Sequence, residues 1–432
     1  MTLSDLYNSV GGRFLPYALP ASASFDQIAV EPLLVQEGSV AFILTEDEVM
    51  ARRMIVLARK RGAVAVVSAV PPHFENISCI LVENVFDALY RAGEYCRNRL
   101  SAKVIAVTGT AGKTTTKDML ASMLAKKYKT ACSSGNMNTE AGLTYSLSLM
   151  DEEAEMAVVE LGVGEGTDMG LLSRIAAPDI GIITNIGEAH LNKFGNTENL
   201  LKEKMRLFAS AKSGFQAFLN GDDPYLKNIR EILGVKPYFF RISDYGGMLP
   251  FAGEHFRTDV AAAIAVARYL GVSDSQIKAA LVDFVPMEGR CSYLRIGDIK
   301  VIADYYNANP LSTRAALDLI SGCKGRRVAV LGDMLELGDK AAELHSGIGH
   351  YAAAKPVEEL ICIGELAENI YYSTIDAGFP KECCAWYPDM ETFLGTVKKH
   401  IRSGDTVLLK ASRAMRFERI LKQIEAEQES GA

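Results

Sequence analysis

No stretch of the sequence approaches the roughly 18 consecutive apolar residues of a membrane-spanning helix. The first residues, MTLSDLYNSVGGRF, lack the basic region and continuous apolar core of a signal peptide. CxxC pairs are also missing, since the eight cysteines are scattered and only Cys383 and Cys384 are adjacent. These absences argue against a membrane protein and a structural zinc site. We expect a cytoplasmic protein with reduced thiols.

The chain also has fewer basic than acidic residues. Lys and Arg number 46 against 53 Asp and Glu, which gives a formal net charge of -7. This balance argues against nucleic acid or an anionic membrane as the main partner, although a local cluster can still bind a small anion. The chain has no tandem repeat and no long low-complexity run. Its 432 residues, 49% of them hydrophobic, fit two to four soluble domains of roughly 150 residues each.

Changes of pattern divide the chain into three α/β units, which we expect to span residues 1–100, 101–288 and 289–432. The first alternates short apolar runs with helical segments such as Glu48–Arg61. The second and the Rossmann-like third alternate buried strands with helices, as doubly wound parallel sheets do. The alanine-rich helix Arg257–Leu270 is expected to close the second unit. The expected strands are Val64–Val67, Cys79–Val82, Val104–Thr108, Met156–Leu161, Ile180–Thr184, Phe215–Leu219, Cys291–Ile296, Lys300–Ala303, Arg327–Leu331, Glu359–Ile363 and Thr406–Leu409.

A glycine-rich loop, TGTAGKTTT, follows the first strand of the second unit. The pattern GxxxxGK[ST] would put its first glycine at Val107, whereas Gly109 stands closer to the lysine here. The shorter spacing keeps the physical logic. Glycines let backbone amides approach phosphate oxygens, and the helix expected over Lys113–Lys127 points its positive end at them. A chance turn is disfavoured because strand, glycines, lysine and helix come in the required order.

Nucleotide contacts are therefore expected along this loop. The Lys113 ammonium can neutralise phosphate charge, and the Thr114 hydroxyl can ligate Mg²⁺. Two further polar side chains follow strands of the same sheet, Glu160 after one and His190 after another. Parallel strands bring such groups to one sheet edge, where they can complete a metal site. The expected nucleotide-binding residues of the loop are Thr108, Gly109, Thr110, Ala111, Gly112, Lys113, Thr114 and Thr115.

Several segments together carry a resemblance to a known family. They occur in the order TGTAGKTTTKDML, GNMNTEAGLTYSL, VVELGVGEGTDM, ITNIGEAHLNKFGNTENLLKEK, ADYYNANPLSTRAAL and VLGDMLELG, between roughly residues 103 and 420. The chain resembles the Mur ligase superfamily, and most of all the branch that adds D-alanyl-D-alanine in peptidoglycan synthesis. The resemblance implies an ADP-forming ligase of three domains. The first would bind a UDP-sugar-like acceptor, the second ATP, and the third the incoming amino acid or peptide.

The resemblance also implies a reaction. An acceptor carboxylate, in that branch UDP-MurNAc-tripeptide, is activated by ATP as an acyl phosphate, which the amine of the incoming substrate attacks. The partners would be small molecules, and we expect a monomer. The catalytic set would be Lys113, Glu160, His190 and Lys204. Two Mg²⁺ ions are implied, with Thr114, Glu160, His190 and Lys204 as ligands. Asn136, Asn138 and Thr139 would line the acceptor side.

Lys204 matches the lysine that the family carries as a CO₂-derived carbamate. The physical argument is that a free ammonium near two Mg²⁺ ions would be repelled, whereas an anionic carbamate can ligate metal. By position alone a solvated helix lysine is the simpler interpretation. Lys202, two residues away, is the competing candidate.

The third unit is expected to supply the remaining contacts. By resemblance, Arg290, Asp304 and Asn307 would reach the nucleotide. Tyr306 and Asn309 lie in the same DYYNANP segment and are assigned to substrate. An individual charged residue in this unit can equally be structural. The other expected substrate residues are Asp333, Glu336, His345, Lys410, Ser412, Arg413 and Phe417.

The chain departs from the family in places that bear on specificity. The Asp-Ser/Thr-Arg motif that grips the uridine nucleotide is missing near Val30, Glu31 and Pro32. Phe256 and Asp259 stand where the family has asparagines that read adenine, so the base would be held otherwise, for example by stacking on Phe256. Ala411 replaces a usual glycine. The acceptor is therefore the least determined part of the prediction.

Three alternatives remain open. A paralogue could join another amino acid or peptide to a different carboxylate carrier, which the missing motif favours. A non-catalytic nucleotide-binding regulator is disfavoured by the intact metal set. Folylpolyglutamate synthesis, another branch, is disfavoured by DYYNANP and LGDMLELG.

Overall fold

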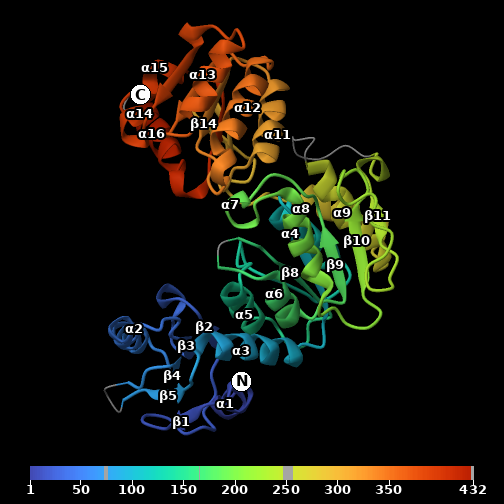
Figure 1. Cartoon of the computed structure of the whole chain (residues 1–432), viewed down its shortest axis with the longest axis vertical. Helices are drawn as coiled ribbons and strands as arrows, with labels where there is room; N and C mark the ends of the chain where they lie inside the picture. Colours follow the sequence, from blue (N-terminus) through green and yellow to red (C-terminus); the bar gives the residue numbers. More distant parts are fainter. Residues whose placement is uncertain (73–75, 165, 247–255, 430–432) are drawn as a thin grey trace.

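The computed structural model describes residues 1–72, 76–164, 166–246 and 256–429. Three β-sheets follow one another along the chain, and helices cover them (Figure 1). The α/β class expected from the sequence is confirmed. Each expected strand is present to within one residue at either end.

The first sheet has five short strands, in the order β1-β5-β4-β3-β2. They are β1 (Arg13–Leu15), β5 (Ser78–Leu81), β4 (Ala65–Ser68), β3 (Ser39–Phe42) and β2 (Gln27–Ala29), and only β1 runs antiparallel to its neighbour. Helices α1 (Leu3–Val10), α2 (Glu48–Lys60) and α3 (Val85–Arg99) accompany this sheet. The Asp47 carboxylate caps α2 by accepting from the Met50 amide at 2.6 Å.

Helix α3 joins the first sheet to the second. It packs on α5 (Glu140–Ser148) and α6 (Met169–Ala176), so one continuous apolar core runs through both regions. The buried Arg97 donates to the carbonyls of Ala176 and Leu100, at 2.7 and 3.2 Å, and pairs with Asp179 at 3.3 Å. The end of α6 is thereby satisfied by a side chain from the N-terminal region.

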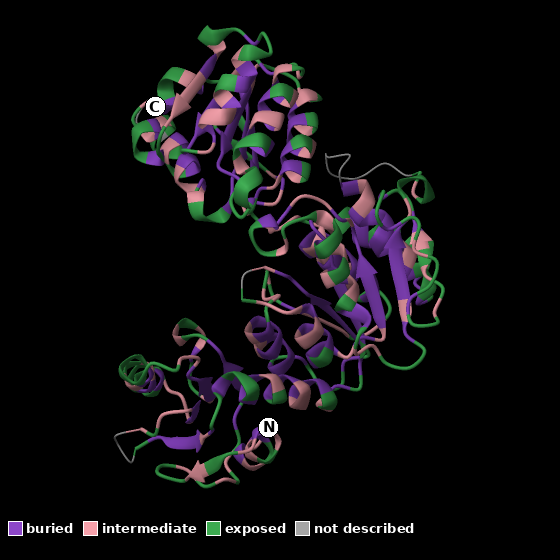
Figure 2. Cartoon of the chain, in the orientation of Figure 1, coloured by how far each residue is buried: buried purple, intermediate pink, exposed green. Residues whose placement is uncertain are grey.

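The central sheet is all parallel, in the order β11-β10-β9-β6-β8-β7. Its strands are β6 (Lys103–Thr108), β7 (Thr130–Cys132), β8 (Met156–Glu160), β9 (Ile180–Ile183), β10 (Gln216–Asn220) and β11 (Tyr238–Phe240). Figure 2 shows β9 and β10 buried, because helices cover both faces. Helices α4 (Lys113–Leu124), α9 (Phe256–Tyr269) and α10 (Asp274–Asp283) cover one face; α5, α6 and α8 (Thr197–Met205) cover the other.

One expectation about this unit is wrong. The alanine-rich helix α9 does not close it, because α10 follows and packs on α4. A reciprocal cap between Ser273 and Gln276 begins α10.

At the β11 edge of the central sheet, the rings of Phe218 and Tyr238 stack with centroids 5.1 Å apart.

The third sheet has the order β12-β13-β17-β14-β15-β16, and only β12 is antiparallel. Its strands are β12 (Ser292–Ile296), β13 (Ile299–Asp304), β14 (Arg327–Gly332), β15 (Glu359–Ile363), β16 (Cys384–Tyr387) and β17 (Thr406–Lys410). Helices α11 (Pro310–Ser321), α12 (Ala341–Ala353) and α13 (Glu368–Asp376) lie on one face. Helices α14 (Met390–Leu394), α15 (Val397–His400) and α16 (Glu418–Glu429) lie on the other.

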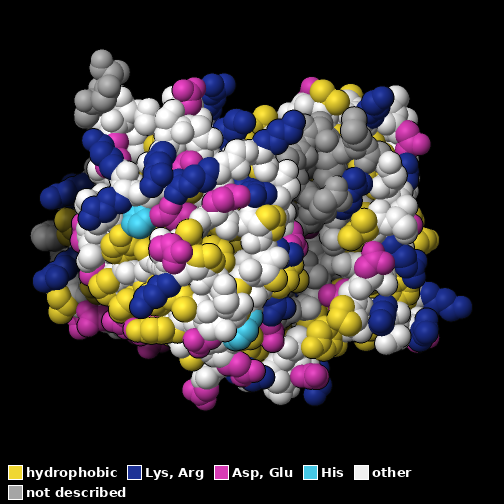
Figure 3. All heavy atoms as spheres, turned by 90° about the horizontal axis from the view of Figure 1, so that it is seen from above, with side chains coloured by type: hydrophobic (Ala, Val, Ile, Leu, Met, Phe, Trp, Pro, Cys, Tyr) yellow, Lys and Arg dark blue, Asp and Glu magenta, His cyan; other side chains and the backbone are white. Residues whose placement is uncertain are grey.

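Within the described residues, every helix is too short or too polar to cross a membrane. Seen from above, the molecule carries Lys and Arg side chains close to Asp and Glu side chains (Figure 3). Such mixing agrees with the modest net charge of the chain.

Candidate active site

The phosphate loop leaves β6 and enters α4 with two glycines in conformations that other residues rarely adopt. Gly109 has φ +153° and Gly112 has φ +78°. A Cβ on Gly109 would stand 1.9 Å from the Thr184 hydroxyl, and one on Gly112 would stand 2.0 Å from Oδ1 of Asp259. Only glycine therefore fits at either position. The loop presents the amino end of α4, a helix of 12 residues, as an anion site.

The end of β9 braces this loop, a role that the sequence alone did not reveal. Asn185 clamps Ala111 from both sides: its Oδ1 accepts from the Ala111 amide at 2.8 Å, and its Nδ2 donates to the carbonyl at 3.1 Å. The Thr184 hydroxyl donates to the same carbonyl at 2.6 Å, and Thr110 Oγ1 accepts from the Gly187 amide at 2.9 Å. The one available signal was that Asn185 follows a strand adjacent to β6.

The expected metal ligands Thr114 and Glu160 are in direct contact. The Thr114 hydroxyl donates to Oε2 of Glu160 at 2.5 Å, and the Asn138 amide donates to Oε1 at 2.7 Å. Both Thr114 and Glu160 are buried. A hydroxyl and a carboxylate at the edge of the phosphate loop form the all-oxygen donor set that Mg²⁺ prefers, so these residues fit the ion.

Two lysines converge on the loop backbone. Lys113 Nζ donates to the carbonyls of Gly109 and Thr110, at 2.9 and 3.2 Å. Lys204, on α8, is 1% exposed, and its Nζ donates to the Gly109 carbonyl at 2.9 Å. Burial and the neighbouring Lys113 hold the pKa of Lys204 well below its usual range. Burial also lowers the pKa of Lys113, against the opposing effect of Glu160.

The loop before α5 lies across the cavity from the phosphate loop. Asn136 and Asn138 line the cavity there, as expected. Thr139 also reaches it, but its hydroxyl caps α5 by accepting from the Gly142 amide at 3.2 Å. A backbone bond from Gly162 to the Asn138 carbonyl, 2.8 Å long, joins this loop to the segment after β8.

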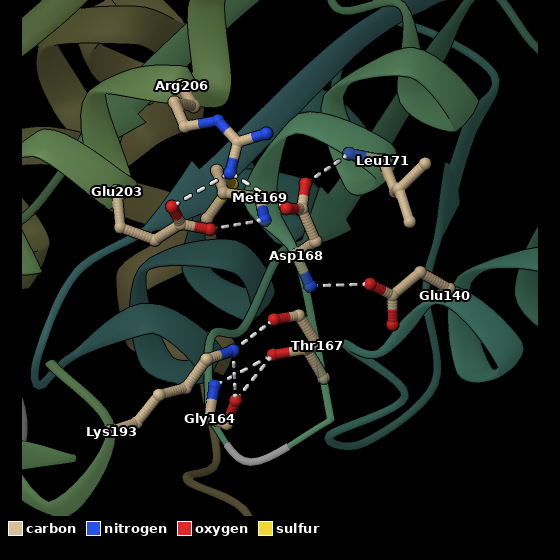
Figure 4. Close-up of polar contacts among 9 residues, drawn as sticks. All are labelled: Glu140, Gly164, Thr167, Asp168, Met169, Leu171, Lys193, Glu203 and Arg206. Carbon is tan, nitrogen blue, oxygen red and sulfur yellow. Dashed lines mark hydrogen bonds and ion pairs between the residues drawn. The ribbon is translucent and has the colours of Figure 1, made fainter.

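The segment after β8 is tied to α7 (Leu191–Phe194), the short helix that follows His190 (Figure 4). Lys193, on α7, donates to the carbonyl of Gly164 at 2.8 Å and to that of Thr167. The Thr167 hydroxyl accepts from the Gly164 amide at 2.8 Å. Gly164 and Thr167 both line the cavity, so Lys193 shapes one of its walls.

Charged groups beside Lys204 hold the far end of the same segment (Figure 4). Asp168 caps α6 by accepting from the Leu171 amide at 2.9 Å, and its own amide donates to Glu140 at 2.7 Å. Arg206 bridges Asp168 and Glu203, at 2.8 and 2.9 Å. Glu203, which precedes Lys204, and Arg206, two residues after it, therefore both belong to this network.

His190 meets the third unit at the domain junction. Its Nδ1 contacts the Glu336 carboxylate, and this bond lowers the pKa of Glu336. Both residues have left-handed backbones, with φ +52° at His190 and φ +64° at Glu336. Strained residues of this kind persist where the surrounding structure over-determines them, often at functional sites. Glu336 was expected at the substrate; in this structure it pairs with a predicted metal ligand.

The third unit closes the cavity with two clusters. In the first, the buried Lys410 pairs with Asp304 at 3.0 Å and donates to the Asn307 carbonyl at 2.5 Å. In the second, the guanidinium carbon of Arg290 lies 4.0 Å from the Tyr306 ring centroid, and that of Arg413 lies 5.8 Å from it. Of the two arginines, Arg290 borders the cavity, so its guanidinium on the ring can keep its charge available to an anion there.

Asp259 occupies an unexpected place. It is buried directly against Gly112. Burial holds the pKa of its carboxyl well above the usual range, while contact with Thr116 and the charges of Arg290 and Lys113 oppose that shift. Phe256 is 3% exposed, yet both residues border the cavity.

Some expected substrate residues have structural surroundings instead. His345 is fully buried; its Nε2 accepts from the Met334 amide at 2.9 Å and its Nδ1 donates to the Ala341 carbonyl at 2.6 Å. Phe417 is fully buried against Gly332. The structure brings neither side chain to the cavity, because both serve the packing of the third sheet. Their expected contact with substrate receives no support from this geometry.

Three other expected substrate residues also make internal bonds. Asp333 Oδ1 accepts from the Ala367 amide at 2.8 Å, and burial raises its pKa. Ser412 Oγ accepts from the Leu335 amide at 2.9 Å. Asn309 caps α11 by accepting from the Ser312 amide at 2.9 Å, although it borders the cavity.

A cavity of about 770 Å³ gathers most of the expected site from two units. Its volume is in the range of small-molecule sites. Of the expected residues, it is lined by Thr110, Ala111, Gly112, Lys113, Thr115, Asn136, Asn138, Thr139, Glu160, His190, Arg290, Asp304, Tyr306, Asn307, Asn309, Glu336 and Lys410.

The segment that lacks the expected uridine-binding motif carries no cationic side chain at the three positions concerned. Val30 is 3% exposed and belongs to the core, Glu31 is exposed, and Pro32 begins a short 3₁₀ turn, Pro32–Leu34. The sheet itself is intact around them. The departure seen in the sequence is therefore a change of side-chain chemistry on a preserved fold.

Comparison with known proteins identifies the class to which this fold and site belong. Residues 107–246 match the Mur ligase middle domain, and residues 289–413 match the family described as Mur ligase, glutamate ligase domain. A curated relative from Bacillus subtilis is 30% identical over 431 residues, covering 92% of each chain. The chain belongs to the Mur ligase family and is an ADP-forming ligase.

Individual relatives indicate a particular branch. The Bacillus subtilis protein is named UDP-N-acetylmuramoyl-tripeptide--D-alanyl-D-alanine ligase. A crystal structure of MurF from Acinetobacter baumannii is 26% identical, with TM-score 0.86 and 98% of each chain covered. MurF ligase from Thermotoga maritima in complex with ADP is 26% identical, with TM-score 0.79, covering 94% of this chain and 98% of its own.

Proposed function

We propose that this protein uses ATP to join D-alanyl-D-alanine to UDP-MurNAc-tripeptide in peptidoglycan synthesis, releasing ADP and phosphate. The observation that carries the proposal is the contact of Thr114 with Glu160 beneath a cavity that Arg290 and Lys410 complete from the third unit. Similarity to ligases of this name over the whole chain supports the choice of substrates.

The first half-reaction transfers the γ-phosphoryl group of ATP to the acceptor carboxylate. Because this transfer needs alignment and charge neutralisation above all, the residues act mainly through position. The amides of the Gly109–Gly112 turn and the amino end of α4 bind the phosphates, and Lys113 neutralises their charge. Arg290, brought from the third unit, adds positive charge at the cavity, while Lys410 holds Asp304 and the Asn307 carbonyl in place.

Thr114, Glu160 and His190 are the residues that would hold Mg²⁺ in this proposal. When bound, the ions would neutralise phosphate charge and polarise the transferred group. Asn138 donates a 2.7 Å hydrogen bond to Glu160, and this bond fixes the orientation of the carboxylate.

The second half-reaction forms the amide. The amine of the incoming dipeptide attacks the acyl carbon, a proton leaves the nitrogen, and the tetrahedral intermediate collapses with release of phosphate. Arg413 is proposed to meet the dipeptide carboxylate: its side chain is exposed beside Tyr306 and also pairs with Glu418 at 3.6 Å. Glu336 and His190 stand nearby at the same junction.

Lys204 is proposed to act as a carbamate. Its pKa is lowered by burial and by Lys113, which favours the neutral amine that attacks CO₂. The new N–C bond leaves a carbamic acid that loses a proton, and the resulting anion would pair with Lys113 or a bound cation. Lys202, the competing candidate, is not buried, which supports Lys204 as the candidate.

The remaining expectations belong to the same proposal. Residues 1–100 would form the acceptor-binding domain, residues 101–288 the ATP-binding domain, and residues 289–432 the domain that receives the dipeptide. The protein would act as a cytoplasmic monomer on small-molecule substrates.

A second candidate rests on one observation. Val30, Glu31 and Pro32 offer none of the cationic grip expected for a uridine nucleotide. A ligase of the same mechanism with another carboxylate carrier is therefore the alternative.

Phosphate release separates the two candidates. The purified protein is assayed with ATP and Mg²⁺, and with UDP-MurNAc-tripeptide and D-alanyl-D-alanine added singly and together. Release that requires both substrates supports the proposal. Turnover only with acceptors that lack the nucleotide would establish the alternative, and no substrate-dependent turnover with any pair would refute the ligase mechanism.

A further inference from the structure

Lys117 is a buried lysine that the proposed mechanism does not use. It lies on α4, one turn after Thr114, and is 1% exposed. An ammonium has three hydrogens to donate, and all three have acceptors here. Its Nζ donates to the carbonyl of Ser133 at 2.5 Å and to that of Gly135 at 3.2 Å, and it pairs with the Asp118 carboxylate at 2.8 Å.

Burying a charge is costly unless it is fully paired, and a packed apolar side chain would fill the same space without that cost. A buried ammonium with all its hydrogen bonds made therefore suggests a role beyond packing. Two of its acceptors are carbonyls of the loop that leads from β7 to α5. Gly135 in this loop has φ +51°, a left-handed turn that exposes its carbonyl to the lysine.

The loop that Lys117 holds contacts Glu160 and borders the cavity. Ser133 Oγ accepts from the Glu160 amide at 3.2 Å, and three residues after Gly135 the Asn138 side chain donates to the Glu160 carboxylate. Asn136 borders the cavity between them. The loop then enters α5, whose Ser148 hydroxyl accepts from the Ile28 amide of the first sheet at 3.0 Å.

Two residues of α4 thus fix the surroundings of Glu160. Thr114 binds the carboxylate directly, and Lys117 holds the backbone that carries Asn138. We infer that Lys117 is a positioning residue that couples the phosphate-binding helix to the acceptor side of the cavity. This inference rests on the proposed function for the identity of the acceptor, and on the geometry alone for the coupling.

The coupling has a defined signature. Without the ammonium, the carbonyls of Ser133 and Gly135 lose their buried partner, and the loop shifts while the phosphate loop keeps its own braces at Asn185 and Thr184. A displacement of about 1 Å at a reacting group can cost on the order of a hundredfold in rate. ADP binding should therefore survive a change that impairs use of the acceptor.

The test is Lys117→Met, with Lys126→Met as the matched control. Lys126 follows α4 closely, lies on the surface and pairs with Asp283 at 2.7 Å, outside the site. In Lys117→Met we expect the KM for UDP-MurNAc-tripeptide to rise about tenfold or more, with the Kd for ADP within about twofold of the parent. Lys117→Arg, which keeps the charge and the donors, should recover part of the loss; Lys126→Met should match the parent.

Amide hydrogen exchange supplies a readout that needs no turnover. Exchange in the segment 133–139 should accelerate in Lys117→Met and stay at the parent rate in Lys126→Met. If the parent enzyme shows no ligase activity but this exchange pattern appears, the proposed function fails and the positioning role stands. If Lys117→Met is too unstable to assay, Lys117→Gln, which removes the charge but keeps a polar group, carries the same two measurements. Unchanged exchange together with an unchanged KM would overturn the inference.

Discussion

Lys113 and Lys204 both donate a hydrogen bond to the carbonyl oxygen of Gly109, and each bond is 2.9 Å long. One lysine comes from the helix after the phosphate loop, and the other from α8, almost a hundred residues later in the chain. Two ammonium groups held on one acceptor repel each other, and this repulsion adds to burial in lowering the pKa of Lys204. The apo site is therefore prepared to accept negative charge, whether phosphate or a carbamate.

Replacing Lys204 tests which kind of charge it supplies. Lys204→Ala should lose activity by about a hundredfold or more, since a metal ligand or its support is removed. Added bicarbonate should not restore the activity, whereas a short carboxylate such as acetate should, by occupying the place of the carbamate. Rescue is measured as phosphate release against carboxylate concentration. Wild-type activity in Lys204→Ala would exclude the carbamate.

Glu160 is expected to control metal affinity. In Glu160→Gln the Thr114 hydroxyl keeps a neutral acceptor, but the anionic oxygen is gone. We expect the Mg²⁺ concentration at half-maximal activity to rise about 10- to 100-fold. The protein should remain folded, because the new amide oxygen can accept from Thr114 and its NH2 can donate to Asn138 once the Asn138 amide turns over. A Mg²⁺ dependence equal to that of the parent would remove Glu160 from the metal site.

Asp259 should make folding stability depend on pH. Its folded pKa is raised above the value of about 3.9 in an unfolded chain, so the folded state binds more protons between those two values. Stability contributed by this group therefore falls as pH rises from about 4 through the folded pKa. Asp259→Asn removes that loss. In apo protein, its melting temperature should exceed the parent's by more at pH 8 than at pH 5.

Each kcal/mol recovered in Asp259→Asn corresponds to about 2–4 °C for a domain of this size. Lys113 and Arg290 are the charged groups that oppose the raised pKa of Asp259. A difference in melting temperature that is the same at both pH values would mean that Asp259 is ionised throughout.

His345 is expected to act on stability and not on substrate binding. His345→Ala leaves the Met334 amide without its buried acceptor and should lower the free energy of unfolding by about 1–3 kcal/mol. Its folded pKa is lowered by burial, so the neutral ring contributes stability that is present above about pH 6.5 and is lost on acidification. Denaturant titration at pH 7.5 and 5.5 measures both effects.

The KM for D-alanyl-D-alanine distinguishes this structural role from the contact expected from the sequence. It should stay within about twofold in His345→Ala at a temperature where the variant is folded. A rise of tenfold or more would restore His345 to the substrate site. An exposed residue such as His350, which bonds only within its own helix turn, provides the matched control as His350→Ala.

Local patterns in the sequence were enough to predict most of the strands. The run KVIAVT is apolar except at its ends and leads into glycines, and this is the strand and loop that the structure has. Short strands without such runs were missed, for example β7 (Thr130–Cys132) and β16 (Cys384–Tyr387). Three or four residues at a sheet edge carry too little periodicity, and pairing with a neighbour makes them strands.

For the functional residues too, some contacts were expected from the sequence and others were not. Thr114 and Glu160 were expected together from motifs, and they touch. Lys117 and Asn185 were not assigned their bracing roles, because the partners of Lys117 lie some 16 residues away and those of Asn185 lie 74 residues away. His345 and Phe417 match family positions, yet their side chains turn into the core. A motif gives a residue's place in the chain, whereas the direction of its side chain depends on packing.

The sequence by itself determined the class of chemistry: a strand, two glycines, Lys113 and a helix in this order predict a compact anion site. Tertiary structure decided which other groups face that site. It brought Lys204 to the carbonyl of Gly109 and buried Asp259 against Gly112, across separations of 95 residues in the first case and more in the second. The physical reason is that local backbone geometry follows from neighbouring residues, while desolvation and charge pairing arise only when distant segments pack together.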